Sequence, residues 1–214
     1  MPIYKTITVS DSTQVYIWKV TESENELAQN ISLTDNSLKR MSRMKSESHR
    51  RAFLSIRHLF IEAGFEDKEV YYNEFGKPFL YDGRYISITH SNEFTAIIVS
   101  EAIKVGIDVE KQRDKILRIA YKFTTFEAYR TLANSEATIR KLTIIWGAKE
   151  SLYKIYGQQG LSFFKHIDVH DFSFEDTKTT AQITYQSQKS NYDVTYLEFE
   201  GFTCVYALRL EDSI

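Results

Sequence analysis

The sequence of 214 residues has little of what builds disulfide scaffolds or flexible linkers: one cysteine, two prolines and eight glycines. Because Cys204 has no intrachain partner, the sequence excludes a disulfide-rich secreted domain and favours a reducing compartment. Its N-terminus alternates in polarity, and no apolar run approaches the roughly 18 residues of a spanning helix. We therefore expect a cytoplasmic protein that binds no membrane.

The sequence also lacks a strong excess of charge of either sign. A net charge of -2 argues against a general nucleic-acid binder, although 14% of the residues are aromatic. The charge is nevertheless uneven, since residues 39–58 hold seven lysines and arginines and two histidines against one acid, Glu47. A local basic patch of this kind suits a compact phosphorylated ligand.

The hydrophobic pattern predicts an α+β fold of two halves, residues 1–102 and 103–214. Period-two alternation and turn residues predict strands over 3–9, 14–20, 85–89, 94–99 and 105–110, and further sheet over 166–210. Apolar residues at helical spacing predict helices over 36–63, 114–122, 125–133 and 135–156. Each half is expected to be a small antiparallel sheet packed with helices. Because no linker separates the halves, we expect them to be packed together.

The first candidate site is Val105-Gly106-Ile107-Asp108-Val109-Glu110. On a strand the apolar residues would face the core, while Asp108 and Glu110 would share the opposite face, about 6.6 Å apart. Their repulsion is roughly 2.5 kcal/mol at an effective dielectric of about 20, but only about 0.6 kcal/mol in water. A cation would remove that cost in a cleft, whereas on an open surface the pair is an ordinary solvated one.

The second candidate site is one face of the helix over 135–156. Trp146, Glu150 and Lys154 are four residues apart and therefore align along the helix. The simplest interpretation is a surface ion pair beside a core tryptophan. The functional interpretation adds a third carboxylate for magnesium, which prefers oxygen ligands, and an ammonium for a phosphate.

Two polar turns complete the set of candidates. Gly76-Lys77-Pro78 combines close backbone approach, a cation and a fixed chain direction. Thr89-His90-Ser91 ends a predicted strand with three polar side chains that could donate to phosphate oxygens. Taken alone, these segments are better explained by a solvated lysine in a plain turn and by a structural or solvated histidine.

These segments occur together in an order and spacing typical of one family. The sequence resembles the Sfp-type 4'-phosphopantetheinyl transferases over about residues 39–154. The resemblance is carried by Arg51-Ala52-Phe53-Leu54, Gly76-Lys77-Pro78, Thr89-His90-Ser91, Gly106-Ile107-Asp108-Val109-Glu110 and Trp146-Gly147-Ala148-Lys149-Glu150-Ser151-Leu152-Tyr153-Lys154. Two positions depart from the usual pattern, which commonly has alanine in place of Ser151 and often serine in place of Thr89.

The resemblance implies a transferase that moves 4'-phosphopantetheine from coenzyme A to a serine of an apo carrier protein. The products would be holo carrier protein and adenosine 3',5'-bisphosphate, and the carrier could be of the acyl, polyketide or peptidyl type. The family fold is a pseudo-dimer of similar α+β halves with the active site in the cleft between them. A fused pseudo-dimer is expected to act as a monomer.

The resemblance also implies roles for individual residues. Magnesium, with manganese as a substitute, would be held by Asp108, Glu110 and Glu150. The catalytic residues would be Glu150 as base, Lys154 on the pyrophosphate and Asp108. Coenzyme A would be bound by Arg51, Gly76, Lys77, Pro78, Thr89, His90, Ser91 and Lys154.

Some alternatives stay open on the sequence. A non-catalytic coenzyme A or nucleotide-binding module would keep Arg51, Lys77 and His90 but should lack a metal carboxylate, and all three carboxylates are present. A nucleic-acid binder would use the basic helix, but no recognised motif accompanies it. The sequence does not determine which of Lys39, Arg40 or Arg43 joins the phosphate site, nor which carrier pathway is served.

Overall fold

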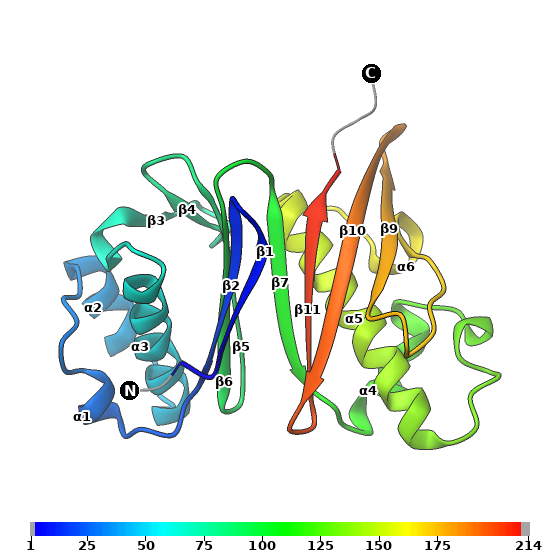
Figure 1. Cartoon of the computed structure of the whole chain (residues 1–214), viewed down its shortest axis with the longest axis horizontal. Helices are drawn as coiled ribbons and strands as arrows, with labels where there is room; N and C mark the ends of the chain where they lie inside the picture. The colour runs from blue at the N-terminus through cyan, green and yellow to red at the C-terminus, as the bar shows by residue number, and fades with distance from the viewer. Residues whose placement is uncertain (1–2, 211–214) are drawn as a thin grey trace. The chain divides into compact units, whose positions relative to one another are not determined.

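The computed structural model of the protein describes residues 3–210, and the chain divides into two compact units, Met1–Ala102 and Ile103–Ile214. Each unit contains an antiparallel sheet with helices packed on it, which confirms the predicted α+β class (Figure 1). Within residues 3–210, no helix is both long and apolar enough to cross a membrane.

The first unit is built on a four-stranded sheet in the order β1-β2-β6-β5. The strands expected over 3–9, 14–20, 85–89 and 94–99 are all present, the first two paired with each other and the last two likewise. A tight turn at Asn92, whose φ is 52°, joins the last two. A hairpin, β3-β4, forms a separate two-stranded sheet that was not predicted. The elements are β1 (Lys5–Ser10), β2 (Thr13–Lys19), α1 (Glu24–Leu27), α2 (Asp35–Ser42), α3 (Glu47–Glu62), η1 (Asp67–Glu69), β3 (Val70–Tyr72), β4 (Pro78–Leu80), β5 (Tyr85–Ser91) and β6 (Phe94–Ser100).

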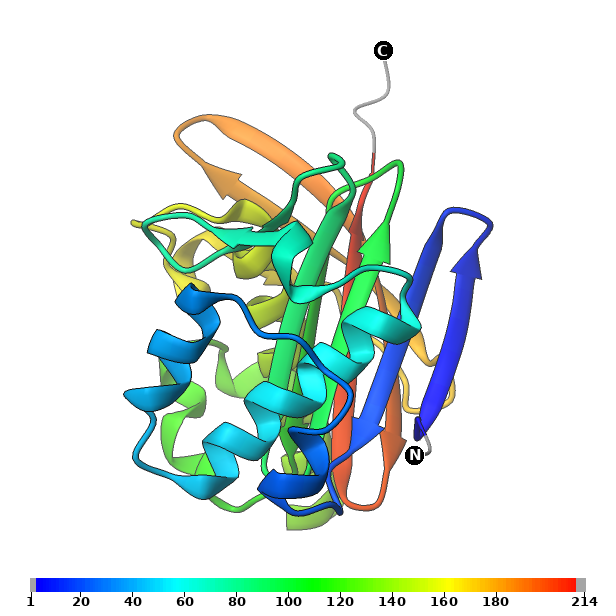
Figure 2. The same ribbon diagram turned by 90° about the vertical axis from the view of Figure 1, so that its left-hand side faces the viewer.

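Helix α3 covers one face of this sheet (Figure 2). Its apolar stripe, which includes Leu54, Leu59 and Phe60, is fully buried against Trp18 and Ile97. A buried hydrogen bond of 2.9 Å between the hydroxyls of Ser55 and Thr95 ties the helix to β6. The predicted helical spacing therefore identified the packed face of α3, which includes Leu59 and Phe60. Leu38, near the start of the predicted helix over 36–63, is instead 47% exposed.

The prediction of one helix over 36–63 is wrong, because the chain forms α2 and α3 with a break between them. The guanidinium of Arg50 donates to the carbonyls of Met44 and Lys45 at 3.0 and 3.3 Å, where a continuous helix would need internal bonds. The same side chain pairs with Glu24 at 2.8 Å. Side-chain bonds to distant residues therefore stabilise the break, although the segment contains neither glycine nor proline.

A buried ion pair fixes α2 and α3 in place. Arg57 and Asp67 lie 2.9 Å apart and are 2% and 5% exposed. Asp67 also accepts hydrogen bonds from Thr34 and Ser37 at 2.8 to 2.9 Å. Burial raises the pKa of the Asp67 carboxyl, but the hydrogen bonds and the Arg57 charge outweigh burial, so its pKa lies below the ordinary value. The carboxylate is thus a strongly stabilised buried anion.

We expect Asp67→Asn to lower the free energy of unfolding by about 3 to 5 kcal/mol, because Arg57 would keep an uncompensated buried charge. Urea titration followed by tryptophan fluorescence measures the change, since Trp18 is buried in the same unit. The native pKa is depressed below 3.8. The advantage of the native protein is therefore present above pH 3.8 and is lost as the pH falls through the depressed value.

Asp82→Asn is the matched control. Asp82 also pairs with an arginine, Arg84, at 2.7 Å, but its side chain is 46% exposed. We expect a loss below about 1 kcal/mol for this exposed pair. Equal losses in the two variants would show that burial does not determine the strength of the Asp67 pair.

The second unit contains a five-stranded sheet in the order β7-β11-β10-β9-β8. The predicted helix over 135–156 and the predicted C-terminal sheet are confirmed, and Gly157 ends the helix with a φ of 69°. The elements are β7 (Val105–Lys111), α4 (Lys115–Ile119), η2 (Ala120–Lys122), η3 (Phe126–Ala128), α5 (Ser135–Tyr156), α6 (Phe163–His166), β8 (Ile167–Val169), β9 (Lys178–Tyr185), β10 (Gln188–Phe199) and β11 (Phe202–Arg209).

Helix α5 lies along this sheet and packs most closely on β7 and β11 (Figure 1). Its apolar residues Leu142, Ile144, Ala148 and Leu152 are fully buried in the core of the unit. The two helices predicted before it are shorter than expected. Residues 114–122 form α4 and a 3-10 turn, and residues 125–133 form only the 3-10 turn η3 followed by turns. Ile116, Ile119 and Ala120 of the first segment nevertheless pack on the core of the unit.

Candidate active site

Strand β7 carries its two carboxylates on the face that α5 covers. The apolar residues Val105, Ile107 and Val109 are buried as expected, but Asp108 is also only 5% exposed. Asp108 lies opposite Val205 of β11, and Val205 belongs to the core beneath α5. The carboxylates and the apolar residues lie on opposite strand faces, as expected. The face with the carboxylates is not open to solvent, however, because α5 packs on it.

Two glycines let α5 approach the sheet closely. A Cβ added at Gly106 would lie 2.0 Å from the carbonyl oxygen of Ser151, and one added at Gly147 would lie 2.7 Å from a methyl group of Val205. Both contacts are impossible for a real side chain. The glycine in each of the two motifs thus sets the helix-to-strand distance and brings Glu150 and Lys154 near Asp108.

Lys154 contacts β7 directly. Its ammonium donates to Oδ1 of Asp108 at 2.9 Å and to the carbonyl oxygen of Ile107 at 2.7 Å. The lysine side chain is 28% exposed and the aspartate 7%. A partly exposed cation therefore neutralises a buried carboxylate, and it can reach solvent by a change of rotamer.

Glu150 lies one helical turn before Lys154 and interacts with both carboxylates of β7. Burial first, and then the negative charge of Asp108, raise the pKa of Glu150 to about 7, while Lys154 opposes the rise and Glu110 adds to it. The structure thus brings Asp108, Glu110, Glu150 and Lys154 into one electrostatic group. A carboxyl group with a pKa near 7 is suited to proton transfer at neutral pH.

The donor atoms of this group match a hard divalent cation in type. Across residues 3–210, no three histidine, cysteine, aspartate or glutamate side chains are arranged as a ready metal-ligand set. Magnesium rarely needs such a cage, because it commonly takes one or two carboxylates and completes its shell with substrate phosphate and water. The carboxylate oxygens of Asp108, Glu110 and Glu150 are of the type that magnesium prefers. In this structure the cation in contact with Asp108 is Lys154.

Lys149, adjacent to Glu150 in the sequence, has a different environment. The residue is 5% exposed, and its ammonium donates to the carbonyl oxygens of Phe163 and Ile167 at 2.8 and 2.5 Å. Burial lowers its pKa to about 8, and Asp168 opposes this shift. Lys149 therefore anchors α6 and β8 to the helix.

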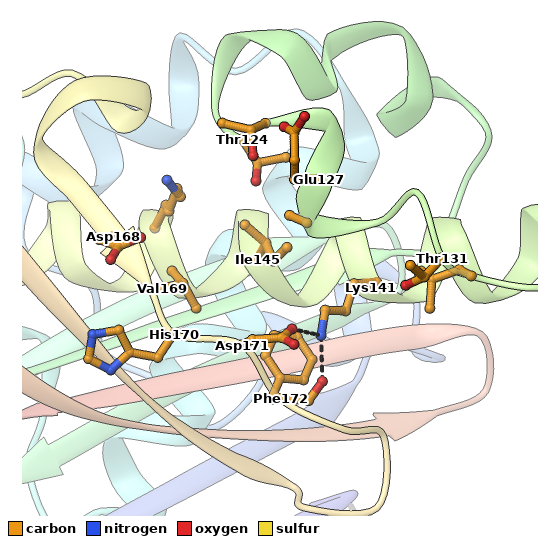
Figure 3. Close-up of a pocket in the computed structure, with 14 residues that line it drawn as sticks. Thr124, Glu127, Thr131, Lys141, Ile145, Asp168, Val169, His170, Asp171 and Phe172 are labelled. Carbon is orange, nitrogen blue, oxygen red and sulfur yellow. Dashed lines mark hydrogen bonds and ion pairs between the residues drawn. The ribbon is translucent and has the colours of Figure 1, made fainter.

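Lys149 also lines a polar pocket of about 450 Å³ (Figure 3). Lys141, two turns earlier on α5, points to the same pocket, where it pairs with Asp171 at 2.7 Å and donates to the carbonyl oxygen of Phe172. Both lysines are held by groups of the chain itself. The two lysines therefore connect α5 to the segments that surround this pocket, and both already have hydrogen-bond partners within the protein.

In the first unit, a second pocket of about 560 Å³ brings together Arg51, His90 and Ser91. Arg51 donates through Nε to the carbonyl oxygen of Glu22 at 2.6 Å and through Nη2 to that of Val20 at 3.3 Å. These bonds fix the guanidinium plane. The other lining residues are Val20, Ser48, His49, Ala52, Asn92 and Glu93.

The remaining predicted residues lie elsewhere in the same unit. Thr89 is buried in β5, and Gly76-Lys77-Pro78 forms the turn that leads into β4; none of these residues lines the Arg51 pocket. The amide oxygen of Asn73 accepts from the backbone of Phe75 and Lys77 at 3.0 and 2.9 Å, and Gly76 has a φ of 80°. Glycine is therefore needed here for the turn itself.

Comparison with known proteins gives a family match for the second unit. Residues 104–207 match the sequence model of the 4'-phosphopantetheinyl transferase superfamily. A relative, the 4'-phosphopantetheinyl transferase gsp of Aneurinibacillus migulanus, is 29% identical over 135 residues. That match covers 62% of this chain and 54% of the relative, so the aligned part spans about half the relative's length.

These matches confirm the resemblance drawn from the motifs. The structure also explains one departure from the usual pattern. Where alanine is common, Ser151 donates from its hydroxyl to the carbonyl oxygen of Val205 at 3.0 Å. The residue stays small enough for close packing and adds a bond between α5 and β11. The substitution therefore preserves the position of Glu150.

Sequence reasoning missed His49 as a site residue. Its ring lies 5.9 Å from that of His90, measured between centroids. His49 precedes Arg51 by two residues, a spacing that does not place two side chains on one helical face. The one signal in the sequence for a role of His49 in this pocket is its position in the basic segment, in what is the first turn of α3.

Proposed function

We propose that the protein is a magnesium-dependent 4'-phosphopantetheinyl transferase that acts on coenzyme A and a serine of an apo carrier protein. The observation that carries the proposal is the group formed by Asp108, Glu110, Glu150 and Lys154, which lies inside the region that matches the superfamily. The products are holo carrier protein and adenosine 3',5'-bisphosphate. A non-catalytic coenzyme A-binding module on the same fold is the alternative.

In this proposal the second unit provides the reaction chemistry. Asp108, Glu110 and Glu150 would hold magnesium, or manganese in its place, on the pyrophosphate of coenzyme A. When bound, the ion supplies positive charge that stabilises the departing phosphate oxygen. Lys154 would move its ammonium from Asp108 to the pyrophosphate, a change that its partial exposure permits.

The first unit would bind the nucleotide end of coenzyme A. Arg51 and His90 would contact the 3'-phosphate, and Ser91 of the same pocket would donate to it. Thr89 would support His90 from within β5, and Gly76, Lys77 and Pro78 would line the adenine end. Guanidinium groups held by backbone carbonyls lose little further freedom when they bind phosphate, which favours affinity.

The reaction is a phosphoryl transfer, in which positioning and charge neutralisation do most of the work. The carrier serine oxygen forms a bond to the phosphorus that bears the pantetheine arm, and the bond from that phosphorus to the bridging oxygen breaks. Glu150 accepts the serine proton, directly or through a water molecule. Lys154 stabilises the negative charge on the released adenosine 3',5'-bisphosphate.

The rest of the proposal concerns the setting of the enzyme. We expect a cytoplasmic monomer that contacts neither nucleic acid nor membrane. The single cysteine supports the compartment, and the near-neutral net charge argues against nucleic acid. The lack of a long apolar run argues against a membrane, and the pseudo-dimer implied by the family resemblance supports a monomer. Fatty acid, polyketide, nonribosomal peptide and aryl polyene carriers all present the required serine, and the proposal is not limited to one of them.

Mass spectrometry of an apo carrier protein incubated with this protein, coenzyme A and magnesium tests the proposal. We expect a gain of about 340 Da, the mass of one phosphopantetheine group. A carrier whose acceptor serine is replaced by alanine, and a reaction containing a chelator, should both show no gain. If no member of a panel of carrier types gained mass while coenzyme A still bound, the non-catalytic alternative would replace the proposal.

A further inference from the structure

We propose that His49 is a second imidazole ligand, beside His90, for the 3'-phosphate of coenzyme A. In this role His49 helps to select coenzyme A over its 3'-dephospho form. The inference rests on the proposed function, because it assigns a new residue to the same substrate. Its structural basis is the pocket of about 560 Å³ in the first unit, where the rings of His49 and His90 lie 5.9 Å apart.

The pocket has the chemistry of a phosphate monoester site. Its lining combines the guanidinium of Arg51 and two imidazoles with the hydroxyls of Ser48 and Ser91, against the single lining carboxylate of Glu93. A phosphate monoester carries about -1.5 to -2 charges at pH 7 and has three acceptor oxygens. Several donors on different sides of the pocket are therefore needed to satisfy it.

The two histidines approach the pocket from separate elements. His90 lies near the end of β5, and His49 lies in the first turn of the 16-residue helix α3. The amino end of a helix carries a partial positive charge, which adds to the favourable potential for an anion. His49 thus supplies a donor from the helix side, while His90 supplies one from the sheet side.

Arg51 explains why a second imidazole is useful. Two of the three nitrogen atoms of its guanidinium already donate to the carbonyls of Glu22 and Val20. The arginine is therefore rigid and offers the ligand only part of its donor set. An imidazole beside it compensates by contacting a phosphate oxygen that the guanidinium does not reach.

The test is the ratio of KM values for coenzyme A and 3'-dephospho-coenzyme A, measured with carrier protein and magnesium. A hydrogen bond to a charged group corresponds to roughly a 10-fold to 100-fold change in affinity. We expect His49→Ala to raise the KM for coenzyme A by about 10-fold, and to change kcat and the KM for the dephospho form by less than about twofold. The assignment would be wrong if His49→Ala raised the KM values for both substrates by the same factor, or raised neither of them.

Two further variants separate the possible causes. Lys45→Ala removes an exposed cation, four residues before His49, that does not line the pocket. If His49 acts by direct contact and not by its charge alone, Lys45→Ala should leave the ratio of KM values unchanged. Arg51→Ala should reduce the same selectivity. If Arg51→Ala alone reduced it, the pocket would bind the phosphate without His49, and the inference would be wrong.

Calorimetric binding of adenosine 3',5'-bisphosphate and of 5'-AMP keeps the inference testable without turnover. His49→Ala should weaken binding of the bisphosphate by about 10-fold and leave that of 5'-AMP unchanged. If no carrier were modified but this difference appeared, the proposed function would fail and the His49 assignment would stand. If the unchanged protein did not prefer the bisphosphate, the assignment would fail.

Discussion

Replacing Glu150 by glutamine should reduce the rate of phosphopantetheine transfer by about 10³-fold or more while the protein keeps its fold. The amide keeps the size of the side chain but cannot accept the serine proton or offer an anionic oxygen to a cation. General base catalysis alone contributes about 10² to 10⁴-fold. Because the repulsion between Glu150 and Asp108 would disappear, we expect the free energy of unfolding to be unchanged or slightly higher.

Glu136→Gln is the control for this experiment. Glu136 is an exposed glutamate in the first turn of the same helix. Its replacement should leave the transfer rate within about twofold and lower stability by less than about 1 kcal/mol. Initial rates of carrier modification at saturating coenzyme A and magnesium decide the question. Near-native turnover of Glu150→Gln would remove Glu150 from the mechanism.

Asp108→Ala should lower the transfer rate by about 10³-fold and abolish its dependence on magnesium. Asp108 is 5% exposed and binds the ammonium of Lys154. The substitution therefore removes the most buried oxygen donor of the proposed cation site and leaves Lys154 with only the carbonyl of Ile107 on that strand. A magnesium titration of the residual activity should be flat.

Asp193→Ala provides the comparison, since Asp193 is an exposed aspartate on β10 of the same sheet. It should retain both the rate and the magnesium response. Calorimetry with magnesium and adenosine 3',5'-bisphosphate supplies a readout other than turnover. If Asp108→Ala folded normally and still bound magnesium in that mixture with native affinity, Asp108 would not be a metal ligand.

The elements that carry the candidate site were readable from the sequence because their patterns are local. Alternation along β7 and helical spacing along α5 predicted both elements within one residue of their observed ends. Asp108 and Glu110 were placed on one strand face, and Glu150 and Lys154 on one helical face, by periodicity alone. The grouping of these four residues was then implied by the family resemblance rather than by the pattern.

The break between α2 and α3 could not be read locally. No glycine or proline marks it, and it depends on Arg50 reaching Met44, Lys45 and Glu24. Alternation along β7 identified its two faces. It could not show that α5 covers the face with the carboxylates. Contacts between residues far apart in the chain decide both the helix break and the burial of the carboxylate face.

The sequence by itself determined the strands, the principal helix and the types of donor atom available for catalysis, because these depend on periodicity and side-chain chemistry. Tertiary structure alone decided that Lys154 neutralises Asp108, that Glu150 has a pKa near 7, and that His49 lies beside His90. Burial and the distance between charges set these properties. For Asp108, Glu150 and Lys154, both follow from the close approach of α5 to β7, which no local pattern encodes. His49 and His90 come together from two separate elements, α3 and β5.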